Sequence, residues 1–295
     1  MSTQTTTAAV TAAATPAPRK PRITVGGIGF AILVITTCIA VVYPFYWMII
    51  ASFMPEGYSI ANAPLFYPEQ FTFDTFAKLF ATRPIWTWLL NTFVVTIGST
   101  LLTIPFSVLA AYSLHRYRFS GRRFVIFFVL LTQLLPATAI IVPFFITFRN
   151  YGLLDTLHGV ALAYMTFTIP MGIWILWGYF QSIPLDFEES ALVDGCTQMG
   201  AFFRVTLPLA IPGIAATSLY VFLDGWNQYL LAYILTSSTQ QWVISLGLFS
   251  FIGEYFVEIE QMMAASVVAS LPALLVFAML QRYMRGGLAL GGMKG

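Results

Sequence analysis

Long apolar stretches alternate with short polar connections along most of the chain. The six longest run roughly over residues 28–53, 85–114, 124–148, 158–180, 211–235 and 262–283. Each is near or above the roughly 20 residues that a helix needs to cross a bilayer. The pattern predicts an all-α, polytopic membrane protein with six transmembrane helices. A further apolar stretch at 242–252 is too short to span, and we expect it to be an interfacial or docking segment.

The composition favours lipid as the natural solvent of the chain. Hydrophobic residues make up 58% of the sequence and charged residues only 9%, whereas a soluble domain usually carries about 25% charged residues. The net charge of +2 and the lack of basic runs interleaved with aromatic residues argue against a nucleic-acid partner. Cys38 and Cys196 match no metal or redox spacing.

The first 22 residues differ from the rest of the chain. They are rich in Thr, Ala and Pro and have no apolar periodicity, which predicts a disordered cytoplasmic tail at 1–22 and a transmembrane domain at 23–295. The apolar stretch that follows is longer than the 7–15 residues typical of a cleavable signal. We therefore expect a retained first span.

Basic residues favour the cytoplasmic side of a membrane. In a six-span topology, the tail, the second-to-third connection, the fourth-to-fifth connection and the C-terminus share one side. That side carries Arg19, Lys20, Arg22, Arg116, Arg118, Arg122, Arg123, Arg204, Arg282, Arg285 and Lys294, and the other carries Lys78, Arg83 and Arg149. The distribution predicts that both termini are cytoplasmic.

Several predicted spans contain proline, at positions 44, 105, 136, 143, 170 and 272. Neighbouring helices in a membrane can bond the carbonyl groups that proline leaves free. Kinked spans would suit a pathway that opens and closes, and simple tolerance of proline explains any single position equally well.

The fourth-to-fifth connection, residues 181–213, has helix signals of its own. Ser182 is predicted to cap a short helix with Asp186 in its first turn, and Gly195 to end that helix in the left-handed conformation. Thr197 can cap a second short helix, and Pro208 interrupts the chain before the next span. This unit is too polar for lipid and too apolar for a free loop, so we expect it to dock on another protein.

The same connection resembles a known family. Glu189-Ser190-Ala191, Gly195 and Leu207-Pro208 have the spacing of the "EAA" loop of ABC importer permeases, with Ser190 in place of the usual Ala. The carbohydrate-specific branch of this family is similar to the chain in two segments, residues 184–195 and the sequence FLDGWN at 222–227. Residues 263–295 resemble the end of the maltose-type, MalG-like subunit. The resemblance covers roughly residues 28–295.

The resemblance implies that residues 181–212 form a coupling loop that sits in a groove of a separate ATPase subunit. Glu189 would contact the ATPase, Gly195 would make the turn, and Leu207 and Pro208 would fix the junction with the fifth span. The implied ATPase-coupling set is Glu188, Glu189, Ala191, Asp194, Gly195, Leu207 and Pro208. The alternative is an ordinary amphipathic loop on the membrane surface.

Two further segments receive roles from the resemblance. The C-terminal residues Gly291, Gly292, Lys294 and Gly295 would reach between the ATPase subunits, unless they are simply a solvated end. The outer connection at 236–261 aligns with a loop that probes the sugar cleft of a binding protein. Its acidic residues, Glu254, Glu258 and Glu260, could equally form a solvated face.

Polar groups inside the spans are candidates for a substrate path. Acidic residues at membrane depth are costly and usually face a cavity or a partner. Asp224, Trp226, Asn227 and Gln228 could line a sugar path, because aromatic faces and amides suit sugar hydroxyls and C–H surfaces. The alternative is bonding between helices, which we favour for Asn227. Weaker candidates are Asn91, Gln133 and Trp174.

Taken together, these features predict the permease subunit of an ATP-binding-cassette importer that takes up a sugar, of di- or oligosaccharide size at the family level. It would be a non-catalytic, multi-pass protein of a bacterial or archaeal inner membrane, without a cofactor, because a separate ATPase would bind ATP and Mg²⁺. Its partners would be a second permease subunit, two ATPase copies and an extracytoplasmic sugar-binding protein. The alternative is a secondary transporter or channel. The sequence contains neither a P-loop nor an H-E-x-x-H motif.

Overall fold

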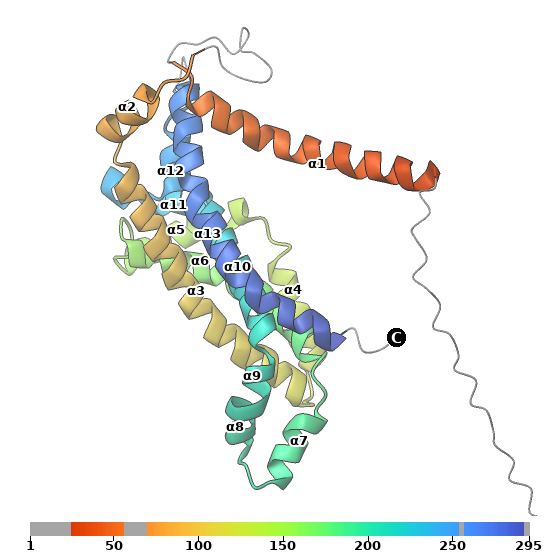
Figure 1. Ribbon diagram of the computed structural model, residues 1–295. Helices are drawn as coiled ribbons and strands as arrows, with labels where there is room; N and C mark the ends of the chain where they lie inside the picture. Colours follow the sequence, from red (N-terminus) through yellow and green to blue (C-terminus); the bar gives the residue numbers. More distant parts are fainter. Residues whose placement is uncertain (1–24, 56–69, 254–256, 292–295) are drawn as a thin grey trace, which may run out of the picture. The chain divides into compact units, whose positions relative to one another are not determined.

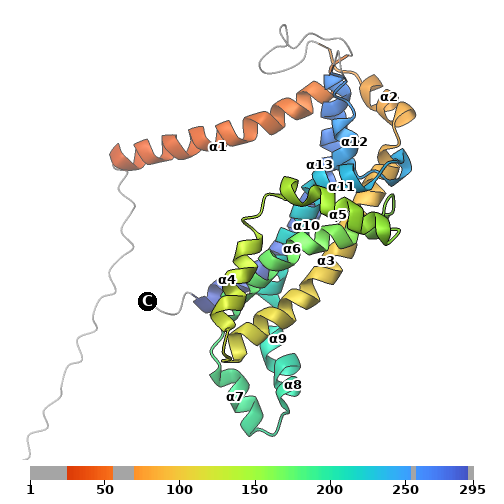
Figure 2. The ribbon, with the colours of Figure 1, turned by 180° about the vertical axis from the view of Figure 1, so that it is seen from behind.

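The computed structural model describes residues 25–55, 70–253 and 257–291, and within these ranges the chain is almost entirely helical (Figures 1 and 2). The elements, in order, are α1 Val25–Ser52, α2 Asp74–Thr82, α3 Ile85–Arg116, α4 Arg122–Thr132, α5 Ala137–Asn150, α6 Leu157–Phe180, α7 Asp186–Val193, α8 Gln198–Ala201, η2 Phe202–Thr206, α9 Leu207–Leu209, α10 Ile211–Asn227, α11 Leu230–Leu235, η3 Thr239–Gln241, α12 Ile244–Phe249 and α13 Ile259–Gly291.

The chain forms two units, residues 1–46 and 47–295. Most of α1 lies in the first unit. Among the described residues, four helices, α1, α3, α6 and α13, are long and apolar enough to cross a membrane. The number rises to six if each of two bent helix pairs crosses as one span. The first bent pair joins Arg122–Thr132 to Ala137–Asn150, and the second joins Gln198–Leu209 to Ile211–Asn227.

Helices α3 and α6 pack closely at the centre of the larger unit. Their interface contains small and hydroxylated residues. A Cβ atom added at Gly172 would lie 2.5 Å from Ser107 Oγ, and the hydroxyl oxygens of Thr103 and Thr168 lie 2.8 Å apart. Small residues and hydrogen bonds of this kind let membrane helices approach closely where lipid supplies no hydrophobic driving force.

The third apolar stretch is not one continuous helix. Helix α4 ends at Thr132, and α5 starts at Ala137 with a 93° change of direction. Pro136, in extended conformation, precedes α5, whereas Pro143 lies inside α5. Proline cannot donate the backbone hydrogen bond that would continue α4. The apolar stretch at 124–148 therefore contains two helices, with the break beside Pro136, one of the prolines noted in the predicted spans.

The fifth apolar stretch is also interrupted. Helix α10 ends at Asn227 and α11 starts at Leu230. The carbonyl oxygen of Gln228, at the break, accepts 2.8 Å hydrogen bonds from Tyr164 Oη and Ser245 Oγ. Two side chains from other elements thus satisfy a backbone group that the helix leaves free, as the apolar interior requires.

The apolar stretch at 242–252 lies mainly within the core of the larger unit. Val243, Ile244 and Phe251 are almost fully buried. A Cβ atom added at Gly247 would lie 2.2 Å from the Trp88 ring, so glycine is needed for this close approach of α12 to α3. The expectation of an interfacial segment is corrected for most of its residues, whereas Phe249 and Ile252 remain about half exposed.

Candidate functional site

The connection between α6 and α10 forms two short helices in a hairpin at one end of the larger unit (Figure 1). Helix α7 has three acidic residues in its first turn, at positions 186, 188 and 189, where they suit the positive end of the helix. Gly195 follows α7 with a φ of 89°, and Thr197 Oγ1 accepts a hydrogen bond from the Gly200 amide at 3.1 Å. The predicted turn and second cap are confirmed.

The predicted cap of the first short helix is wrong. Ser182 Oγ donates a 2.7 Å hydrogen bond to the Tyr179 carbonyl, so its hydroxyl serves the end of α6. The residue that precedes α7 is Leu185, which makes no side-chain cap. A serine next to two helix ends can serve either one, and here the local α6 carbonyl is the partner.

Glu188 is the buried anchor of this loop. Its side chain is only 4% exposed. One carboxylate oxygen accepts hydrogen bonds from Tyr112 Oη at 2.8 Å and from Arg116 Nε at 2.9 Å, and the other accepts one from Thr206 Oγ1 at 3.0 Å. Glu188 therefore ties α7 to the end of α3 and to η2. The Glu188 carboxylate thus faces its own subunit, so within the predicted coupling set it is an internal contact between the hairpin and α3.

The other residues of the predicted coupling set divide by exposure. Glu189, Asp194, Gly195 and Pro208 are exposed, Leu207 is half-buried and Ala191 is buried. The loop also exposes four large apolar side chains. They are Phe187, Val193, Met199 and Phe203. Their combined exposure within a polar hairpin is the signal that marks a docking face.

The hairpin joins α10 through an irregular segment. Residues Phe202–Thr206 form a π-helical turn, a feature often found at functional sites. The buried Phe202 ring lies 4.4 Å from the Tyr112 ring. The chain then bends by 69° between the segments Gln198–Leu209 and Ile211–Asn227. Leu207 and Pro208 form α9 just before this bend, at the predicted junction.

The predicted ATPase-contacting tail falls largely outside the described residues. Gly291 is the last residue of α13. Gly292, Lys294 and Gly295 lie beyond the described ranges, as does Glu254 of the outer connection.

An open hollow of about 470 Å³ lies beside the end of α10, lined by Tyr220, Leu223, Asp224, Asn227 and Gln228. It brings three of the four predicted path residues together. Trp226 is the exception. It is 5% exposed and donates a 3.2 Å hydrogen bond from Nε1 to the Ala269 carbonyl of α13. Its assignment to the path is corrected to a helix–helix contact.

Asn227 is exposed, and its side-chain amide donates to the Leu223 carbonyl within α10 at 2.7 Å. This is a contact within one helix rather than the expected bond between helices. The weaker candidates also have structural partners. Gln133 Nε2 lies 3.4 Å from the Phe167 carbonyl oxygen, and Trp174 packs on Trp177 with 5.2 Å between ring centroids.

At the opposite end of α3, three side chains hold the segment 239–244, which we call the outer strap. Asn91 Nδ2 donates to the carbonyls of Gln240 and Trp242 at 2.6 and 2.9 Å, and Trp88 Nε1 donates to the Thr239 carbonyl at 3.0 Å. Thr92 Oγ1 accepts from the Ile244 amide at 2.7 Å. Asn91 is therefore a structural contact in this chain.

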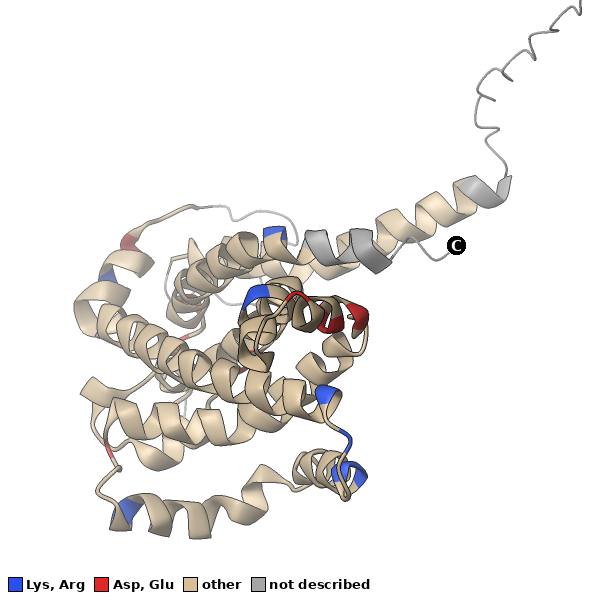
Figure 3. Cartoon of the chain, turned by 90° about the horizontal axis from the view of Figure 1, so that it is seen from below, with Lys and Arg blue, Asp and Glu red and all other residues tan. Residues whose placement is uncertain are grey.

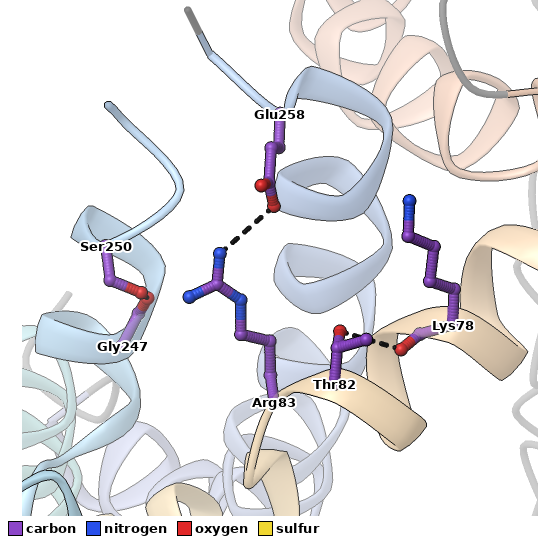
Figure 4. A network of polar contacts seen from close by, with 6 residues as sticks. All are labelled: Lys78, Thr82, Arg83, Gly247, Ser250 and Glu258. Atoms are coloured by element: carbon purple, nitrogen blue, oxygen red, sulfur yellow. Dashed lines mark hydrogen bonds and ion pairs between the residues drawn. The ribbon is translucent and has the colours of Figure 1, made fainter. Parts of the chain in front are cut away.

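Two acidic residues hold the chain near the outer strap. Asp155, with a φ of 54°, accepts hydrogen bonds from both Ser237 and Ser238 amides and from Ser238 Oγ. The Ser238 amide and hydroxyl, followed by the Ser237 amide, lower the pKa of Asp155 below its ordinary value. Glu258 pairs with Arg83 at 3.2 Å (Figure 4), and the Arg83 guanidinium lies over the Phe251 ring.

Charge is sparse on this unit, and Figure 3 views it from the end that carries the hairpin. Within the described residues, no group of three His, Cys, Asp or Glu side chains could hold a metal ion. The arrangement offers a hairpin with exposed apolar side chains, a buried anchor and a polar hollow beside the end of α10.

Long apolar helices, two bent pairs and an external hairpin together define a polytopic membrane component of a transport system. A family model described as "Binding-protein-dependent transport system inner membrane component" matches residues 103–288. The chain belongs to this family. It is therefore a non-catalytic, multi-pass subunit of an ABC importer in the cell membrane.

The chain is similar to curated permeases over most of its length. It is 34% identical over 90% of its residues to the diacetylchitobiose uptake system permease protein NgcG of Streptomyces coelicolor, 87% of which is covered. It is 32% identical over 87% of its residues to the maltodextrin transport system permease protein MdxG of Bacillus subtilis, 92% of which is covered. These relatives are carbohydrate permeases by name.

A solved structure has the same architecture. One chain of a bacterial ABC transporter involved in the import of alginate superposes with a TM-score of 0.75 at 25% identity, covering 90% of this chain and 99% of that chain. The fold of the larger part of the molecule is therefore that of an ABC importer permease.

Proposed function

We propose that this chain is one of two permease subunits of an ATP-driven importer for a sugar of di- or oligosaccharide size. The named relatives belong to transport systems for diacetylchitobiose and maltodextrin, which supports a carbohydrate substrate. In this proposal α4 with α5 crosses the membrane once and α10 with α11 crosses it once, so that six spans leave both termini in the cytoplasm. A six-span subunit supplies half of a pathway, and a second permease supplies the rest.

The observation that carries the coupling role is the hairpin at α7 and α8. Its apolar side chains, including Val193 at 88% exposure, need a partner surface, and the family mechanism assigns that surface to a separate ATPase that binds ATP and Mg²⁺. Glu189, Asp194 and Gly195 are exposed to solvent and are free to contact that partner. Glu188 would pass the movement of the hairpin to α3, because its carboxylate bonds both elements.

The hollow beside α10 is the proposed location of part of the sugar path. Asp224 and Asn227 offer an acceptor and an amide to sugar hydroxyls, each of which needs a partner when it leaves water. An extracytoplasmic binding protein would deliver the sugar at the opposite end from the hairpin. Cysteines placed at 224 and 227 should be protected from thiol reagents by transported sugar, and a cysteine at 226 should not. Equal protection at all three would contradict this path.

The main test uses the assembled transporter in liposomes, with ATP hydrolysis and sugar uptake measured together. Glu189→Lys should remove sugar-stimulated ATPase activity and weaken retention of the ATPase subunit in a pull-down. Gly195→Ala should have a similar, smaller effect, because alanine is strained at a φ of 89°.

Gly121→Ala is the matched control, since Gly121 also has a left-handed φ of 92° but lies outside the hairpin. It should leave coupling close to that of the unsubstituted protein. If the chain purifies without an ATPase and an ion gradient alone drives its uptake of solute, the importer proposal is wrong. The chain would then be a secondary transporter.

A further inference from the structure

A second hollow, distinct from the polar one, lies at the start of α4. Its volume is about 430 Å³, and it is lined by Arg122, Arg123, Ile126, Phe127, Leu130 and Trp177. The lining combines two cationic side chains at the first turn of α4 with apolar side chains over the next two turns. Cationic and apolar groups in one hollow suit a ligand that carries both a negative charge and a hydrocarbon part.

The two arginines lack acidic partners within the described part of the chain. Glu188, the nearest buried acid in the hairpin, is already paired with Arg116. Arg122 Nε and Trp177 Nε1 are shielded from solvent, and neither donates a hydrogen bond within the same part of the chain. Unsatisfied buried donors cost free energy. Rotation of the flexible Arg122 side chain toward a bound anion would satisfy its guanidinium.

The hollow lies at the same end of the unit as the hairpin. Arg116, which bonds Glu188 of α7, precedes α4 by only a few residues, and Trp177 lies in the last turn of α6. In the orientation proposed above, this end faces the cytoplasm, so the inference rests on that part of the proposed function. From Arg122 to Leu130, α4 extends about 12 Å toward the membrane interior, at about 1.5 Å per residue.

We propose that this hollow binds an anionic phospholipid of the cytoplasmic leaflet. The Arg122 and Arg123 guanidinium groups hold the phosphate, which they can contact through paired N–H donors. Ile126, Phe127 and Leu130 contact an acyl chain, and Trp177 is in the last turn of α6, near the end of that span, where tryptophan is common in membrane proteins. Basic pockets between helices on the cytoplasmic side are known to suit anionic headgroups.

The charge and the apolar wall together favour a lipid over other anions. A free phosphate would use the arginines and leave the apolar wall in contact with water. An acidic segment of the second permease subunit could also pair with the two arginines. The experiment below distinguishes this occupant from a lipid.

The test uses the assembled importer in nanodiscs, with bound phosphatidylglycerol counted by native mass spectrometry. Arg122→Gln/Arg123→Gln should weaken retention of one phosphatidylglycerol by about tenfold or more, since each basic residue contributes about 1 kcal/mol near an anionic surface. Arg122→Lys should give an intermediate loss, because the charge remains and the paired donors do not.

Arg118→Gln is the matched control, because Arg118 is in the same connection and does not line the hollow. An equal loss with Arg118→Gln would mean that only general surface charge matters and would overturn the site. Full competition by inorganic phosphate would overturn the lipid assignment. Cross-linking of a cysteine at 130 to the second permease would also overturn it. If the complex couples ATP to uptake but retains no such lipid, this inference fails while the proposed function stands.

Discussion

Helix α3 holds a connecting segment at each of its ends, and it does so by different chemistry. At the hairpin end, Tyr112 and Arg116 bond the side chain of Glu188. At the other end, about 37 Å away at the usual helical rise, Asn91 and Trp88 bond backbone carbonyls of the outer strap. One contact depends on a single charged side chain, and the other depends on backbone groups that every residue has.

This difference predicts which amino-acid substitutions each segment can tolerate. The exposed residues of the outer strap, Thr239 and Gln240, can change their side chains and keep their backbone bonds to α3, which suits a surface adapted to a particular partner. The hairpin anchor requires an acid at 188 opposite a cation at 116. A buried charge that loses its partner is strongly destabilising, whereas neutral hydrogen bonds contribute less individually. The two ends should therefore respond very differently to substitution.

The largest expected effect breaks the hairpin anchor. Arg116→Met leaves the Glu188 carboxylate buried without its cation, and we expect a loss of about 3–5 kcal/mol in stability. The double variant Arg116→Met/Glu188→Gln should recover part of that loss, because it also removes the buried charge. Thermal unfolding of the complex in nanodiscs measures both. If single and double variants unfold alike, the two residues do not act as a pair.

A smaller effect is expected at the outer strap. Asn91→Ala removes the donor to two carbonyls and should cost about 1–3 kcal/mol. Sugar-stimulated ATPase activity should change less than in Arg116→Met, and thermal unfolding together with hydrogen exchange over 239–244 reports the local loss. A collapse as large as that of Arg116→Met would remove the distinction between the two ends.

The smallest effect concerns acid at the neighbouring Asp155. Its pKa is lowered in the folded protein, so its contribution to stability is present above the ordinary carboxyl pKa of about 3.9 and is lost as the pH falls through the lowered value. Ser237 and Ser238 amides should then exchange faster, after correction for intrinsic rates. Asp155→Asn, which tolerates the left-handed φ, should show faster exchange already at pH 7. If the Ser237 and Ser238 amides exchange at the same rate in Asp155→Asn, the charge of Asp155 does not hold this segment.

Local signals in the sequence predicted much of the hairpin. Gly195 and Thr197 act through their own backbone neighbours, so their spacing was sufficient to predict the turn and the cap. Glu188 could not be separated from Glu189 in the same way. Which of two adjacent acids points inward is decided by Tyr112 and Arg116, more than 70 positions away in the sequence.

The apolar stretches were found for the same reason, since hydropathy is a local property. Pro136 marked a possible kink in the third stretch, but neither the full break at 133–136 nor the break at 228 was predicted. Gln228 leaves the helix because Tyr164 and Ser245 are available to bond its carbonyl, and such partners are known only after folding. Trp226 was misassigned because the α13 carbonyl that its indole bonds is also distant in sequence.

The sharp turn between α4 and α5 has a consequence for biogenesis. The two helices have 11 and 14 residues, and each alone is shorter than the roughly 20 residues that a single crossing needs. The insertion machinery therefore cannot accept either helix as an independent segment. In a nascent chain halted after Thr132, α1 and α3 can already span the membrane, but the third crossing becomes possible only once α5 has also been synthesised.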